Sequence, residues 1–419
     1  MSTAYANALA GLNANSQAIN IVSSNLANLS TSGYKAQQVS FEDLVNESLS
    51  GYANSAAISG STIARSNQQF TQGTLQTTGN PYDAAVQGDG FFVVRTTGGQ
   101  DVFTRQGNFH VDASGNLVTA TGQFVQGWNA SAGTLTTNGA TSDIVLPTNL
   151  VLPPTPTTQF TVSANLNANA TVGAPNATFS SPIQVYDSQG TAHTLTVTYT
   201  LTSPNTWSYN VTIPSSDLTA GGTGATQITT GTVAFDGTGQ LVTPTAQAGP
   251  VAIKVTGLAS GANDLNLNWN LYSADGTPTL TQYNQPSANI ATSQDGVAPG
   301  ELTSMSIGTN GEIVAKFSNG TSENVAQIAL ASVLNPDSMQ QLDGNTFAPT
   351  SLTANPVIGT PSTGARGQIT GGALETSTVD IATEFTNLLQ YERGYQANSK
   401  VISTEDQVVQ QTISLIANG

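Results

Sequence analysis

Cysteine is absent from this 419-residue chain, and basic residues are scarce. The lack of cysteine excludes disulfides, thiolate catalysis, iron–sulfur clusters and thiolate zinc sites. Nine lysine and arginine residues stand against 25 acidic ones, which gives a net charge of −16, and none of the nine lies between Arg105 and Lys254. Such a chain lacks the positive surface that nucleic acid or an anionic membrane attracts, so we expect neither as a partner.

Long apolar runs are also missing. The sequence contains no stretch of about 18 apolar residues, the length that a membrane-spanning helix needs. Its first residues, MSTAYANALAGLNANSQAINIV, lack a basic region followed by a continuous apolar segment, so we expect no cleavable secretory signal. We therefore expect no membrane insertion, and export from the cytoplasm would use another route.

Histidine occurs only twice, as His110 and His193, both on or beside predicted strands, where we expect a solvent-facing position. The motifs HExxH and GxSxG are absent. The pair Gly88 and Gly90 is followed by Val93, where a dinucleotide fingerprint requires a third glycine. The sequence therefore predicts no catalytic residue, no metal site and no bound cofactor.

Carboxylates leave one alternative open, because 25 acidic residues can always form some close pair. The segments Asp112 to Gly115 and Asp187 to Gly190 could contact calcium, but they lack the dense ligand series of an EF-hand loop. We interpret both as hairpin turns. No enzymatic activity is expected.

Both ends of the chain carry an apolar residue at every seventh position. Near the N-terminus these are Tyr5, Leu12, Ile19 and Leu26, flanked by Leu9 and Val22. Near the C-terminus they are Ile381, Leu388, Tyr395, Ile402, Val409 and Ile416, flanked by Phe385 and Ile413. This spacing predicts two long helices that pair as a left-handed coiled coil. Packing of each stripe on a globular body is the alternative.

The expected start of the second helix is marked by a capping box. Ser377 lies three residues before Asp380, and Asp380 and Glu384 place negative charge in the first turns, where the helix dipole favours it. One such helix is not stable alone. We expect both ends to be weakly ordered in the free subunit and to fold when copies assemble.

Between the ends the apolar pattern changes to every second residue, which is typical of half-buried strands. A predicted hairpin alternates Leu195, Val197, Tyr199 and Leu201 with threonine, and after a short turn it continues with Trp207, Tyr209, Val211 and Ile213. Leu265, Leu267 and Trp269 repeat the pattern. The expected fold class is therefore mainly β with α-helical termini.

Composition divides the chain further. We predict a terminal helical coiled-coil domain of 1–30 and 370–419, an extended connector of 31–71, a discontinuous inner β-domain of 72–145 and 285–369, and a second all-β domain, 146–284, inserted in it. The segment PTNLVLPPTPTT marks the entry into the inserted domain, which is rich in threonine and nearly free of positive charge.

Two terminal motifs resemble those of the bacterial flagellar rod and hook axial protein family. The stretch NIVSSNLANLSTSGYKAQQVSFEDL carries Asn25, Asn28, Gly33, Tyr34 and Lys35 of the N-terminal motif. The stretch from Leu374 to Leu415 carries Arg393, Gln396 and Asn398 of the C-terminal motif. The segments GDGFFVV and SQDGVAPGELTSMSIGTNGEIVAKFSNG also resemble the β-domain of the family, so the likeness covers about 1–145 and 285–419.

The resemblance implies a structural subunit, of which many copies form a short curved tube that transmits torque from the flagellar rod to the filament. The insertion resembles hook subunits more than distal-rod subunits, which typically lack it. Implied partners are further copies of the chain, the rod, the hook–filament junction proteins, the hook cap and the type III export apparatus, and the implied location is extracellular. Phe41 and Val45 match an export-gate motif, or they are two apolar anchors of the connector.

Three alternatives remain. A distal-rod or hook-associated junction subunit would share the terminal motifs. An extracellular β-rich adhesin would explain the threonine-rich middle, with Trp207 and Trp269 stacking on sugar, although their alternating positions favour core packing. An enzyme is the least favoured of the three.

Overall fold

The computed structural model describes residues 3–44, 61–131 and 133–417. The chain divides into two compact units: unit 1 comprises 1–148, 304–315 and 322–419, and unit 2 comprises 149–303 and 316–321. The chain passes between the two units four times, and two of these crossings lie within strands, β22 (Gly300–Ile307) and β23 (Glu312–Phe317). The fold is mainly β with a helix at each end, as the sequence predicts.

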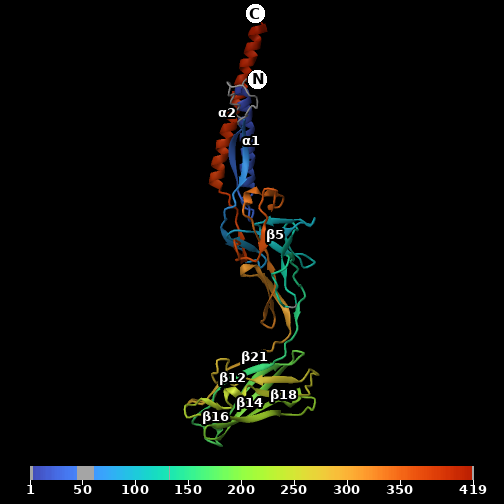
Figure 1. Ribbon diagram of the computed structural model, residues 1–419, viewed down its shortest axis with the longest axis vertical. Coiled ribbons are helices and arrows are strands. Elements are labelled where there is room, and N and C mark those ends of the chain that lie inside the picture. Colours follow the sequence, from blue (N-terminus) through green and yellow to red (C-terminus); the bar gives the residue numbers. More distant parts are fainter. Residues whose placement is uncertain (1–2, 45–60, 132, 418–419) are drawn as a thin grey trace. The chain divides into compact units, whose positions relative to one another are not determined.

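Unit 1 contains both helices, α1 (Thr3–Ala27) and α2 (Ile381–Ala417), which lie side by side (Figure 1). The capping residue of α2 is Asp380, whose Oδ1 accepts a 2.7 Å hydrogen bond from the backbone N–H of Thr383. This bond and others at the helix start lower the pKa of Asp380. The predicted cap, Ser377, accepts only a 3.4 Å bond from Val379, so the capping prediction was wrong by three residues.

The predicted connector is in part a β-hairpin. Strands β1 (Gln37–Leu44) and β2 (Ser61–Gln68) pair antiparallel over eight residues, from Gln37 opposite Gln68 to Leu44 opposite Ser61, and contact α1. Their sequences are mostly polar and do not alternate, which is why no strand was predicted there. Val45 lies outside the described residues.

The remaining strands of unit 1 form one main sheet with short flanking pairs. Its central order is β24-β9-β5-β6-β27-β26. Phe91, Phe103, Trp128 and Phe347 form an aromatic core on it. The strands not yet given bounds are β3 (Leu75–Thr77), β4 (Ala84–Gln87), β5 (Phe91–Arg95), β6 (Asp101–Thr104), β7 (Phe109–Val111), β8 (Leu117–Thr119), β9 (Phe124–Asn129), β10 (Ser142–Asp143), β24 (Ser322–Ile328), β25 (Leu330–Ser332), β26 (Gln340–Leu342), β27 (Thr346–Ala348), β28 (Val357–Gly359), β29 (Gln368–Gly371) and β30 (Ala373–Glu375).

Unit 2 contains two five-stranded sheets that share one apolar core. One sheet has the order β13-β14-β15-β16-β17, and the other has β18-β19-β12-β20 with β21 also paired to β12. Their bounds are β12 (Gln159–Asn165), β13 (Thr178–Tyr186), β14 (Ala192–Ser203), β15 (Thr206–Pro214), β16 (Ala225–Phe235), β17 (Leu241–Thr243), β18 (Val251–Val255), β19 (Leu265–Trp269), β20 (Leu280–Thr281) and β21 (Ala288–Gln294). The short strand β11 (Val151–Leu152) pairs with β22 instead.

The predicted hairpin is confirmed as β14 and β15, with Val197 opposite Val211 and Tyr199 opposite Tyr209. Every second residue of both strands is buried. Trp207 and Trp269 are both 0% exposed, and Trp269 stacks on Phe160. Neither tryptophan can stack on an external sugar, which removes the observation that favoured an adhesin.

The two histidines differ in environment. His110 on β7 is exposed, as predicted. His193 on β14 is 3% exposed, so the prediction of a solvent-facing position was wrong. It lies in phase with Leu195 and Val197, whose side chains face the core, and its ring nitrogens are paired with two carboxylates.

Candidate functional site

The two helices of unit 1 are antiparallel and approach each other through small residues. A Cβ atom on Gly11 would lie 2.7 Å from Nδ2 of Asn398, and one on Gly394 would lie 2.6 Å from Oδ1 of Asn15. Further along, Nδ2 of Asn25 donates a 3.0 Å hydrogen bond to Oε1 of Glu384. Each step forward along α1 is thus matched by an equal step backward along α2. Glycine at these positions permits the close approach.

The buried stripe of α1 differs from the predicted one. Ala8, Ala14, Ala18, Val22 and Asn25 are buried. Of the predicted seam only Val22 belongs to this stripe; Tyr5, Leu12, Ile19 and Leu26 are half-buried, and Leu9 is 43% exposed. The seven-residue repeat predicts a helix partner but does not say which side of α1 faces it. Asn25 of the buried stripe, and Gly11 and Asn15 beside it, contact α2, so the closer contact is made on the side of the small residues.

The predicted stripe of α2 is mostly exposed in the single subunit. Leu388 and Ile402 are half-buried, and the side chain of Ile416 lies outside the described residues. The exposed apolar residues of the helix, which we call the α2 face, are Ile381, Phe385, Leu389, Tyr395, Val401, Val408, Val409 and Ile413, with exposed fractions from 38 to 60%. A soluble single molecule rarely leaves so many large apolar side chains exposed along one helix.

The α2 helix is also longer than its partner, with 37 residues against 25. In the antiparallel register, Thr3 of α1 falls opposite Asp406 of α2. The last turns of α2, with Val408, Val409 and Ile413, therefore have no described residue of α1 opposite them. Burial of this part of the α2 face therefore requires contacts beyond the described residues of α1.

At the other end of the helix pair, Asn25 joins three segments. Its Nδ2 donates to the backbone oxygen of Gln37 at 2.7 Å and to Glu384, and its Oδ1 accepts from the Tyr34 hydroxyl at 3.2 Å and from the backbone N–H of Gln37 at 3.0 Å. Both donors and both acceptor sites of the amide are thereby used. Burial raises the pKa of Glu384, against the effect of the bond from Asn25.

Next to Asn25 lies a buried ion cluster made of Lys35, Arg105 and Glu375. Lys35 Nζ lies 2.7 Å from Oε1 of Glu375, and both side chains are 0% exposed. Arg105 Nη1 lies 3.4 Å from Oε2 of Glu375. Burial lowers the pKa of Lys35, although Glu375 opposes this effect. One carboxylate thus holds two cations that come from distant parts of the chain.

Gly33 fits between these groups. Its φ of +66° is in the left-handed region, and a Cβ atom there would lie 2.6 Å from the backbone carbon and oxygen of Arg105. Its N–H donates to the backbone oxygen of Glu375 at 2.8 Å. Only glycine satisfies this position without displacing backbone.

The structure brings together four of the eight family-motif residues. Asn25, Gly33, Tyr34 and Lys35 meet at this polar junction, which we define as these four residues with Arg105, Glu375 and Glu384. Asn28 follows α1 and donates to the backbone oxygen of Ser24 at 2.9 Å. Asn398 packs against Gly11, whereas Arg393 and Gln396 are exposed. Four residues with close contacts here were not predicted as site residues from the sequence: Glu375, Arg105, Gly11 and Gly394.

Phe41, the described half of the predicted export motif, lies on β1 and is 45% exposed. Its ring packs edge-on against Tyr391 of α2 at a centroid distance of 5.7 Å. In the folded subunit it therefore contributes to the contact between the β1–β2 hairpin and α2.

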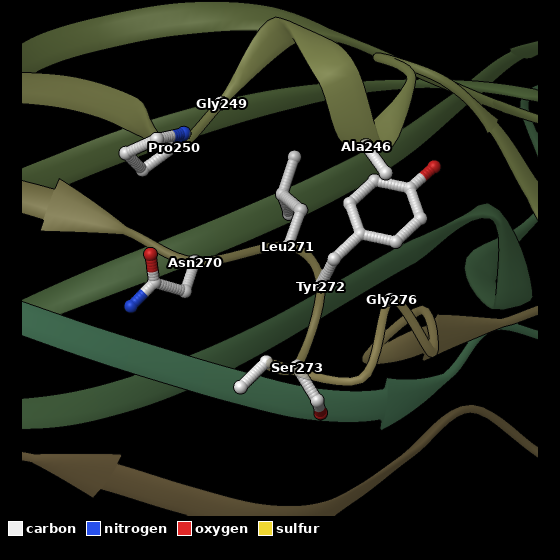
Figure 2. A pocket seen from close by; sticks show the side chains of 9 residues that line it. Ala246, Gly249, Pro250, Asn270, Leu271, Tyr272, Ser273 and Gly276 are labelled. Carbon is white, nitrogen blue, oxygen red and sulfur yellow. The ribbon is translucent and has the colours of Figure 1, made fainter.

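Unit 2 contains a cavity of its own. A cavity of about 280 Å³ in unit 2 is lined by Pro250, Asn270, Leu271 and Tyr272 and by small residues (Figure 2). The lining carries no carboxylate, imidazole or amine, and the Tyr272 hydroxyl lies 2.8 Å from the backbone oxygen of Pro244. Within the described residues, no group of three or more histidine and carboxylate side chains could hold a metal ion.

Among the described helices, none is both long and apolar enough to cross a membrane.

Comparisons with known proteins identify the family. Four family models match: a flagella basal body rod protein model at residues 6–35, the flagellar hook protein FlgE/F/G D1 domain at 85–167, the flagellar basal body protein FlaE D2 domain at 165–297, and the flagellar basal body rod FlgEFG protein C-terminal region at 370–415.

Relatives align over nearly the whole chain. The flagellar hook protein FlgE of Salmonella typhimurium is 31% identical over 98% of this chain and 99% of its own, and that of Treponema pallidum is 31% identical over 97% and 98%. The crystal structure of Helicobacter pylori flagellar hook protein FlgE2 matches 72% of this chain and 100% of its own with a TM-score of 0.53 and 18% identity, which supports the fold. The chain belongs to the flagellar hook protein FlgE family.

Proposed function

We propose that this protein is a structural subunit of the extracellular flagellar hook and that the α2 face is its main contact with further copies. Family membership supports the hook assignment over a rod subunit, an adhesin or an enzyme. The observation that supports the contact is the exposure of eight large apolar side chains on one helix. Because about half of each side chain is already covered, burying the rest would contribute roughly 0.7–1.5 kcal/mol per residue, so several such contacts together can drive assembly.

In the same proposal, copies form a curved hollow tube whose channel is lined by the paired helices. The domain scheme predicted from the sequence, with a helical domain of 1–30 and 370–419 and an inserted domain of 146–284, describes the roles of the parts. The terminal helices make the contacts that hold the tube together, and the β-rich parts accommodate its bending. A charge-poor surface supports this because like charges would otherwise repeat at every contact between copies.

Further partners belong to the proposal as well. These are the rod at one end, the hook–filament junction proteins at the other, the cap during growth and the type III export apparatus before assembly. Phe41, with Val45, is the proposed export signal, for which secretion of a Phe41→Ala variant is the assay. Phe41 is 45% exposed, but its ring also packs edge-on against Tyr391 of α2. This contact supports a second role for Phe41, in the folded subunit after export.

The α2 face can be tested with a single charge. The variant Phe385→Asp is expected to fold like the wild type, because Phe385 is 52% exposed in the subunit, but to raise the concentration needed for polymerisation at least about tenfold. The reason is that assembly would bury a carboxylate in place of an aromatic ring. Sedimentation and electron microscopy of the purified protein measure this.

The matched control is Gln390→Asp, which adds the same charge at an exposed polar position of the same helix. This variant should polymerise close to the wild type. Equal assembly by both variants would show that Phe385 does not lie in the contact between copies.

A further inference from the structure

His193 occupies an unusual place in unit 2, between two acidic residues. Its Nδ1 lies 2.9 Å from Oδ2 of Asp217, and its Nε2 lies 3.3 Å from Oδ2 of Asp187. The imidazole is 3% exposed, because β14 turns this side chain toward the core. Both ring nitrogens therefore face carboxylate oxygens, of which that of Asp187 is fully buried and that of Asp217 is 24% exposed.

The Asp187 carboxylate is held in its ionised form. Its Oδ1 accepts the backbone N–H groups of Gln189 and Thr191 at 2.8 and 2.9 Å, and its Oδ2 accepts the Ser260 hydroxyl at 2.6 Å. Burial opposes ionisation, but the bonds from Ser260 and from the backbone outweigh it and lower the pKa of Asp187 to about 2. This carboxylate can only accept from His193.

The charge state of the ring follows from its donors. A neutral imidazole has one N–H and one lone pair, so either tautomer would aim a lone pair at a buried carboxylate oxygen. Only the imidazolium ion donates at both nitrogens. We propose that His193 is a charged clamp of unit 2, an imidazolium that ties the turn after β13 to the 3-10 turn Ser215–Asp217.

The clamp reaches a third segment. Ser260 belongs to the loop after β18, and the backbone N–H of Ala259 in that loop donates to the backbone oxygen of Asp217 at 2.9 Å. Ser260 donates to Asp187 rather than to the imidazole, so the cluster is not a serine–histidine nucleophile. Its role is to hold three connections at one edge of the core in a fixed position.

The clamp makes the stability of unit 2 depend on pH. The charged groups of the three segments are Asp187 and Asp217. Lys254 and Asp264 are close to the third segment in the sequence, but they form an exposed ion pair with each other, with Nζ 3.4 Å from Oδ2. Two carboxylates favour the protonated ring in the folded state, so the stabilisation is complete at a pH where histidine is also protonated in the unfolded chain. It falls as rising pH removes the proton from the unfolded chain first. Unit 2 should therefore unfold more easily at alkaline pH.

Nitrogen NMR of the full-length, histidine-labelled protein tests the charge state directly, because the chain has only two histidines. His110 on β7 is exposed and gives a reference signal in the same spectrum. At pH 8, His193 should show two protonated ring nitrogens. A neutral tautomer of His193 at pH 8 would overturn the proposal.

Urea unfolding tests the consequence. With Trp128→Phe as background, Trp207 and Trp269 report on unit 2, and the unfolding constant of the otherwise unchanged protein should rise at least about tenfold between pH 6.5 and 9. His193→Gln should be less stable at pH 6.5 and lose this dependence, whereas His110→Gln should retain it. An equal pH dependence in all three proteins would contradict the clamp. If His193→Gln does not fold, the NMR measurement on the wild-type protein alone tests whether His193 is an imidazolium.

Discussion

The variant Glu375→Gln should lose about 3–5 kcal/mol of the free energy of unfolding of unit 1. Glu375 is the one carboxylate that contacts both Lys35 and Arg105, and Lys35 and Glu375 are fully buried. Glutamine keeps the shape but removes the negative charge, so two cations remain close together in a medium that solvates them poorly. Urea unfolding followed by Trp128 fluorescence in a Trp207→Phe and Trp269→Phe background measures the loss.

The loss should shrink as the pH rises. Burial already lowers the pKa of Lys35, and removing Glu375 lowers it further, so the folded variant releases this proton before the unfolded chain does. Stability then increases with pH, because the unfolded state binds more protons. The control is Glu392→Gln, which removes an exposed carboxylate of α2 and should change stability by less than about 0.5 kcal/mol. Similar losses in both variants would show that the ion cluster is not what stabilises the junction.

Replacing Gly33 with alanine should be the second most damaging change, at about 2–5 kcal/mol. Two effects combine at this position. The left-handed φ of +66° is unfavourable for alanine, and the new Cβ would lie 2.6 Å from the backbone of Arg105, which cannot move aside as a side chain could. The shift would also disturb the ion cluster, because Arg105 belongs to it.

Gly79→Ala separates the two effects. Gly79 has a φ of +76°, and a Cβ atom there would meet no atom within 4 Å. This control should cost about 1–2 kcal/mol, the price of the backbone conformation alone. Thermal or urea unfolding of the two variants gives the difference. If Gly33→Ala were no worse than Gly79→Ala, the close contact with Arg105 would not constrain the junction.

Local patterns explain what the sequence could predict. The alternation of Leu195 to Leu201 gave the β14 strand and its buried face because neighbouring side chains of a strand point to opposite sides. The same alternation also placed His193 on the buried side, two residues before Leu195. The general preference of histidine for the surface predicts an exposed His193, whereas the alternation predicts a buried one. The structure agrees with the alternation.

The helices illustrate a different limit. The seven-residue repeat predicts α1 and α2 and places large residues such as Leu12 and Ile19 at the seam. In the structure these two are half-buried, and Ala14, Ala18 and Val22 are buried. Periodicity fixes spacing, and the partner decides which stripe it covers. Glycine at 11 and 394 was the available signal, because glycine within a helix is costly unless a close neighbour requires it.

The polar junction could not be derived from spacing. Lys35 and Glu375 are separated by 340 positions, and no local pattern joins them. The resemblance supplied Asn25, Gly33, Tyr34 and Lys35, but not their partners. In a chain with only 8% charged residues, however, each charge flanking a motif is a candidate for a specific contact, and Arg105 and Glu375 could have been singled out for that reason.

Assembly of the proposed tube requires that α2 be buried between copies, and amide hydrogen exchange measures this burial most directly. In the dilute single subunit, residues 406–414 should exchange much faster than residues 384–398, which lie opposite α1. In polymerised protein both segments should be strongly protected. Strong protection of 406–414 in the isolated subunit, or no gain on polymerisation, would contradict the account.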